Sequence, residues 1–106
     1  MSMDMNKMLQ QVQQMQEEMA KAQEELAHET VEASVGGGMV VVKASGSGEI
    51  VEIRISPDVI DPDDPEGLAD LVLAGVNEAL RNAHELMQSK LGGAMGGLRG
   101  LGLPGL

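Results

Sequence analysis

The chain has 106 residues, a formal net charge of −10 at pH 7, and no Cys, Trp, Tyr or Phe. The lack of cysteine excludes disulfide bonds, thiolate nucleophiles and cysteine-ligated zinc or iron–sulfur sites, and it favours a reducing cytoplasm. We therefore expect one small domain that is not an enzyme, needs no cofactor, metal or small-molecule substrate, and has neither a secretory signal nor a membrane span.

An apolar stripe runs through the first 26 residues, with spacings that alternate between three and four. This heptad pattern predicts a long helix that packs along its length against another helix. A domain this small cannot cover such a helix alone, so we expect a seam between two copies of the chain. A Met-rich groove for a helix of another protein is the alternative. The predicted dimer seam contains Met8, Val12, Met15, Met19 and Leu26, and the stripe also includes Met5 and Ala22.

Three short strands are predicted after this helix. Residues 30–35 alternate in polarity, three glycines follow, and an apolar run occupies residues 39–42. A second turn of serines and glycines precedes residues 49–56, where apolar and charged side chains alternate as in a half-buried strand. Because the connections are short, we expect an antiparallel three-stranded meander.

A loop rich in proline and aspartate leads into a second helix. Asp63 or Asp64 is expected to cap that helix, and Pro65 suits its first turn. Calcium binding is the alternative role for the aspartates, but the loop lacks the glycine and closing glutamate of an EF-hand at the required spacing. Capping is therefore the favoured interpretation.

The second helix carries an apolar stripe from residue 68 to about Lys90, so we expect it to cover the sheet. Residues 92–106 contain seven glycines and one proline, a composition that costs a helix or strand stability. We expect residues 1–91 to form the domain and residues 92–106 to form a disordered tail.

Positive charge is scarce and unevenly placed. Residues 1–16 sum to zero and residues 77–106 to +1, so the middle of the chain carries −11. Lys7 lies in a stretch without acids and is surrounded by amides such as Gln14, which donate hydrogen bonds to phosphate oxygens without charge. This helix face is expected to approach a phosphate backbone, and an ordinary solvated surface is the alternative.

The second helix offers weaker candidates. Arg81 lies at helical spacing from His84 and Gln88, and Lys90 follows, but Glu78 and Glu85 are within reach of Arg81. The lack of aromatic side chains removes the stacking platforms used for RNA and single strands. Contact with the backbone of duplex DNA is the nucleic-acid option that remains.

Three stretches occur in a characteristic order. The first reads KMLQQVQQMQE at residues 7–17. The second begins with GGGMVVVK at residues 36–43 and ends with IRISP at residues 53–57, and the third begins with LV at residues 71–72 and ends with VNEAL at residues 76–80. Their order and spacing over almost the entire chain resemble the YbaB/EbfC family of nucleoid-associated proteins. The resemblance implies an α+β protomer of order α-β-β-β-α, in an intertwined homodimer whose helices project like tweezers.

The same resemblance implies a cytoplasmic, nucleoid-associated protein without catalytic residues. Such proteins bind double-stranded DNA with little sequence preference, alter its conformation, and contribute to nucleoid organisation and gene regulation. The expected DNA-binding residues here are Lys7, Gln14, Arg81 and Lys90. Because these helices offer few cations, we expect affinity on the order of micromolar or weaker at physiological salt. An acidic adaptor that binds another protein through the seam or the tail is the alternative function.

Overall fold

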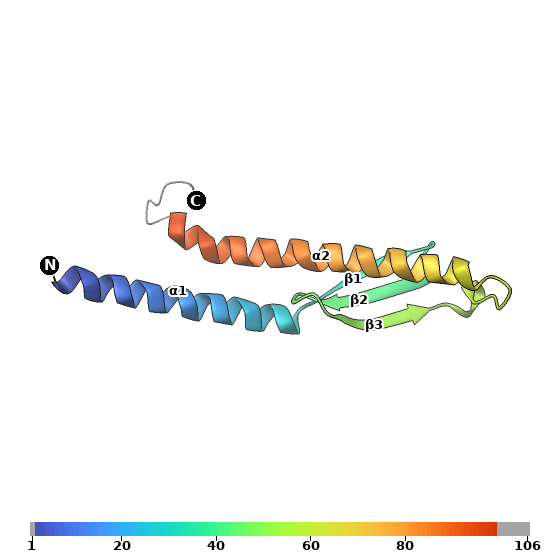
Figure 1. Cartoon of the computed structure of the whole chain (residues 1–106), viewed down its shortest axis with the longest axis horizontal. Coiled ribbons are helices and arrows are strands. Elements are labelled where there is room, and N and C mark those ends of the chain that lie inside the picture. The colour runs from blue at the N-terminus through green and yellow to red at the C-terminus, as the bar shows by residue number, and fades with distance from the viewer. Residues whose placement is uncertain (1, 100–106) are drawn as a thin grey trace.

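The structure is a computed structural model that describes residues 2–99, with side chains described for residues 4–93. Two long helices and a three-stranded antiparallel sheet follow one another in the predicted order, which confirms the α+β class (Figure 1). The elements are α1 (Ser2–His28), β1 (Thr30–Val35), β2 (Val40–Ser45), β3 (Ile50–Ile55), a short 3-10 helix (Pro57–Val59) and α2 (Pro65–Arg99).

The sheet is the predicted meander, in the order β1-β2-β3. Val35 pairs with Val40 across the first turn, and Val40 pairs in turn with Ile55. The first turn needs its glycines, because Gly36, Gly37 and Gly38 all have positive φ angles, a backbone region that other residues adopt at a cost. A register shift between Lys43 and Ala44 interrupts the β2–β3 pairing.

α2 lies across one face of the sheet and forms the core with it (Figure 1). Val40 and Val42 on the central strand are fully buried, and α2 faces the sheet with Gly75, Ala79 and Ala83. Small residues at these positions allow the helix backbone to approach the valines closely. The core is consequently thin, since only these two side chains larger than alanine are fully buried among the described residues.

The other face of the sheet is charged and solvated. Lys43 on β2 lies 3.7 Å from both Glu32 on β1 and Glu52 on β3, and Arg54 lies 3.4 Å from the same two carboxylates. These four side chains compensate one another's charges. The pairs are exposed, so each contributes only about 0–1 kcal/mol.

β3 is less buried than its alternating pattern predicted. Val51 and Ile53 are 52% and 42% exposed, because α2 packs mainly over β1 and β2. Leu73 on α2 is also 59% exposed. The prediction of a half-buried β3 is therefore confirmed for Ile50 and Ile55, which pack against the core, but wrong for Val51 and Ile53, and these large apolar side chains are left without cover in the protomer.

α1 extends beyond the sheet instead of packing on it, while α2 runs first along the sheet and then beside α1 (Figure 1). The molecule measures 75 × 24 × 17 Å, and its radius of gyration is 20.4 Å. A compact domain of this length would have a radius of gyration of about 13 Å. The protomer is an elongated body from which a helical arm projects.

The start of α2 agrees with the sequence-based prediction, but its end does not. Asp64 caps the helix as predicted, because its carboxylate accepts a hydrogen bond of 3.0 Å from the Gly67 backbone N–H. At the other end the helix continues to Arg99, beyond the end expected near Lys90. Leu91 and other good helix formers between the glycines allow the backbone ladder to continue. The domain boundary at residue 91 and the disorder of the tail stay predictions, and residues 100–106 lie outside the described residues.

Candidate nucleic-acid interface

The predicted seam on α1 divides into two parts. Leu26 and Ala22 are buried within the protomer, at 2% and 7% exposure. Met19 and Met15 are half-buried, whereas residues 4–12 are exposed. Leu26 therefore belongs to the protomer's own packing, and the part of the seam still open to a partner comprises Met8, Val12, Met15 and Met19.

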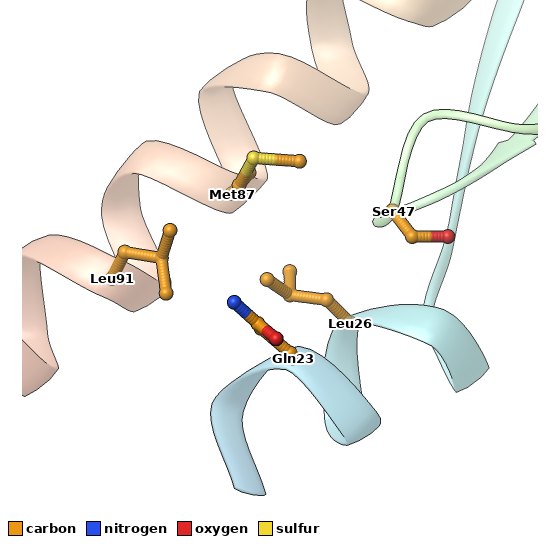
Figure 2. A pocket seen from close by; sticks show the side chains of 5 residues that line it. All are labelled: Gln23, Leu26, Ser47, Met87 and Leu91. Carbon is orange, nitrogen blue, oxygen red and sulfur yellow. The ribbon is translucent and has the colours of Figure 1, made fainter. Parts of the chain in front are cut away.

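Leu26 is held where α1 meets α2 and the β2–β3 turn. Figure 2 shows it facing Met87 and Leu91 of α2 across a largely apolar pocket of about 250 Å³, which Gln23 and Ser47 complete. The turn fits closely, because a Cβ atom added at Gly46 would lie 2.7 Å from the Leu26 carbonyl oxygen. We call this contact region of Leu26, Met87, Leu91 and the turn the joint.

Beyond the joint, residues 4–21 of α1 form what we call the arm. A shallow apolar groove of about 330 Å³ runs along it, lined by Val12, Met15, Gln16, Met19, Ala20 and Gln23. No charged side chain lines this groove, which therefore offers a neutral, partly apolar surface on the arm.

Lys7 and Gln14 are both exposed on the arm. Among the described side chains no salt bridge involves Lys7, whose nearest acids in sequence are Asp4 and Glu17. The structure therefore leaves the Lys7 ammonium exposed among amide side chains, an arrangement suited to phosphate oxygens.

Arg81 and Lys90 differ from Lys7 because both already have acidic partners. Arg81 is exposed and lies 3.7 Å from Glu78, one turn away on α2. Lys90 lies 2.6 Å from Glu29 and 3.1 Å from Glu25, and its side chain is only 22% exposed. Hydrogen bonds to these two carboxylates raise the pKa of Lys90 above its ordinary value. Of the three predicted cationic contact residues, two are thus already paired with carboxylates in the protomer.

The aspartate-rich loop serves helix capping. The Asp61 carboxylate accepts a hydrogen bond of 2.9 Å from the Asp63 backbone N–H, next to the cap that Asp64 provides. Across residues 2–99, no three acidic or histidine side chains are placed to hold a metal ion. Neither of the long helices, as far as the structure describes them, could cross a membrane.

Two features of this surface have no local signal in the sequence. Glu29 pairs with a lysine 61 positions away, and the exposure of Leu73 and Ile53 depends on how α2 is placed over the sheet. Both result from tertiary packing. The periodic stripes indicated which faces are apolar, but they did not indicate which apolar face stays uncovered.

The comparison with family models decides the assignment. Residues 1–98 match the model described as the YbaB/EbfC DNA-binding family. The chain belongs to this family.

Curated relatives support the assignment over nearly the full length. A nucleoid-associated protein of Thermoanaerobacter pseudethanolicus is 55% identical over 103 residues, covering 97% of this chain and 90% of that protein. A nucleoid-associated protein of Saccharopolyspora erythraea is 49% identical over 109 residues, covering 97% and 94%. Both family and relatives are named for nucleic-acid association and not for a reaction.

A crystal structure supports the fold. An uncharacterized protein of Helicobacter pylori superposes with a TM-score of 0.69, covering 77% of this chain and 86% of that one. Only 22% of residues are identical, so this likeness concerns the fold.

Proposed function

We propose that this protein is a nucleoid-associated protein that binds double-stranded DNA, mainly through the backbone and with little sequence preference. It thereby alters DNA conformation and contributes to nucleoid organisation and gene regulation. Family membership supports DNA as the partner, and the observation that carries the mechanism is the arm. Lys7 is exposed there among amides and makes no salt bridge within the described part of the chain.

The mode of contact follows from the charges. Lys7 and the amide side chains around it can bind phosphate oxygens but read little sequence, whereas Lys21, the other cation of the arm, lies within one helical turn of Glu17, Glu18, Glu24 and Glu25. Acidic side chains elsewhere, together with Glu17 and Glu18 on the arm itself, repel the polyanion and restrict its approach to the surface around Lys7. We assign Lys7 and Gln14 to phosphate contact, with Arg81 as a secondary contact that must first exchange Glu78 for phosphate.

We further propose that the working form is a homodimer. The protomer exposes Met8 and Val12 on α1 at 64% and 46%, and Ile53 and Leu73 on the sheet side. Large exposed apolar residues in such numbers indicate a binding surface. A second copy presents the same apolar surfaces, so the two protomers can cover each other's exposed side chains and the thin core. The dimer also brings two arms to one duplex, which doubles the number of cations available for DNA.

A mobility-shift assay on duplex DNA with matched variants tests the proposal. Lys7→Gln is expected to weaken binding because it removes a charged phosphate contact, and Lys7→Glu is expected to weaken it further because it adds repulsion. Lys43→Gln is the control, since Lys43 is compensated by Glu32 and Glu52 on the outer face of the sheet.

The two results have distinct meanings. A shift that is abolished by Lys7→Glu and kept with Lys43→Gln supports duplex binding by the arm. If the unmodified protein gives no shift even at low salt, DNA binding is rejected, and the acidic protein-binding adaptor becomes the better account.

A further inference from the structure

We infer that Lys90 is a positioning residue, which fixes the angle of the arm against α2 instead of contacting DNA itself. The part of this inference that concerns DNA rests on the proposed function, whereas the part that concerns arm geometry does not.

The partners of Lys90 give the first support for this inference. From α2 its ammonium reaches Glu25 in the last turns of α1 and Glu29 just after that helix, at 3.1 and 2.6 Å. Both partners lie more than sixty positions away along the chain, so the contact ties together two elements that the sequence does not connect locally. One side chain thus holds both the end of α1 and the start of β1.

The second support is the place of this contact in the joint. Lys90 is next to Leu91, which faces Leu26 across the pocket of Figure 2. Glu25 is likewise next to Leu26. Toward the arm tip, Met19 is half-buried and Val12 is exposed. The Lys90 bridge therefore lies at the base of the arm, where the packing between the two helices is deepest.

Leverage makes this position important. From residue 22 to Lys7 the helix rises by about 22 Å, at about 1.5 Å per residue. A tilt of about 10° at the joint would therefore move Lys7 by about 4 Å, which exceeds the tolerance of a hydrogen bond to phosphate. Small changes at Lys90 are amplified at the proposed contact.

Charge argues against a direct role. Two carboxylates surround the single Lys90 ammonium, so the cluster has a net charge of −1 and repels phosphate. Its side chain is also more enclosed than that of Arg81, at 22% exposure against 64%. A phosphate that binds Lys90 would have to compete with two short charged contacts.

Spin-label distance measurements test the geometry directly, and the absence of native cysteine allows clean labelling of Gln11→Cys on the arm and Asn77→Cys on α2. Labelled protein is diluted with unlabelled protein, so that distances within one chain dominate. Lys90→Met is expected to broaden and shift the distance distribution. Arg81→Met, which removes the same charge from the same helix, should leave it unchanged.

A double variant with the Lys90 and Glu29 charges exchanged distinguishes a positioning role from direct phosphate binding. Lys90→Glu with Glu29→Lys rebuilds a pair of opposite sign and keeps the net charge, and the introduced ammonium would also face Glu25 one turn away. This variant is expected to restore the narrow distribution, the DNA affinity and the unmodified salt slope. If Lys90 binds phosphate itself, Lys90→Met instead leaves the distribution unchanged and makes the salt slope shallower by about 0.9 per protomer, or about 1.8 for the dimer, because one phosphate contact is lost in each protomer.

The two levels of the proposal fail separately. An unchanged distance distribution in Lys90→Met would overturn the positioning role, whatever the DNA result. A failure of the unmodified protein to bind DNA would reject the proposed function and leave the distance measurement valid.

Discussion

Gly46 and Gly75 mark the two places where a missing side chain sets how the helices pack. At Gly46 an added Cβ would meet the backbone of Leu26, and at Gly75 it would lie 2.8 Å from a methyl group of Val42. Neither glycine has a positive φ angle, so the requirement is for space. Gly46 allows α1 to close onto the β2–β3 turn, and Gly75 allows α2 to close onto the sheet.

Gly46→Ala is expected to destabilise the fold by about 1–3 kcal/mol, because the added methyl group overpacks against backbone that cannot rotate away. Chemical denaturation followed by circular dichroism measures the change. Gly92→Ala on α2 is the matched control, since its Cβ would have no neighbour within 4 Å in the described part of the chain and alanine favours a helix by about 0.5–1 kcal/mol. Equal stability of Gly46→Ala and the unmodified chain would contradict the packing described for the joint.

Asp64 illustrates a residue whose role the sequence did predict. Asp64→Ala should cost about 0.5–2 kcal/mol because it removes the bond to the Gly67 N–H. Thermal denaturation of Asp64→Ala and Asp64→Ser separates the causes, because serine retains an oxygen that can cap the helix. If both variants lose equal stability, capping is not the source of the effect.

At the scale of elements, Lys90 couples α1 to α2 in a manner that depends on pH. Bonds to Glu29 and Glu25 raise the Lys90 pKa above its ordinary value of 10.5. The stabilisation is therefore fully present below pH 10.5 and is lost as the pH rises through the higher folded-state pKa. The thermal unfolding midpoint, followed by circular dichroism, is expected to fall more for the unmodified chain than for Lys90→Met as the pH is raised from about 10 to 12. If the midpoints of the two proteins fall equally over this pH range, Lys90 does not couple the two helices in this way.

Periodicity predicted the elements themselves well. The 3-4 spacing indicated a helix over residues 5–26, which the structure extends to Ser2–His28, and short glycine turns indicated the meander. The sequence was less informative about contacts between elements. It assigned Leu26 to a seam with a partner, whereas the joint buries it in the protomer, and it offered Lys90 to DNA although Glu29 holds it. Side chains of the same kind face inward or outward according to packing, which periodicity does not specify.

At the scale of the whole molecule, the elongated protomer leaves apolar surface that we assign to a second copy. Val12→Glu on α1 and Ile53→Glu on β3 should each shift the chain toward monomer, because a charge would be buried at the interface. Both sites are exposed in the protomer, so the fold should persist. Sedimentation velocity and circular dichroism measure assembly and fold, and Asp61→Asn in the exposed loop before α2 is a control outside α1 and β3. Unchanged assembly in both variants would exclude these surfaces from the dimer.

We propose that the two arms of the dimer bind the backbone of duplex DNA through a few phosphate contacts. Fluorescence anisotropy of a labelled duplex, titrated with the protein at several salt concentrations, tests it most directly. We predict saturable binding, on the order of micromolar or weaker at physiological salt, and a slope of log affinity against log salt of about −2 to −4, which corresponds to about two to four phosphates bound per dimer. A slope near zero, or no binding at low salt, would contradict the account.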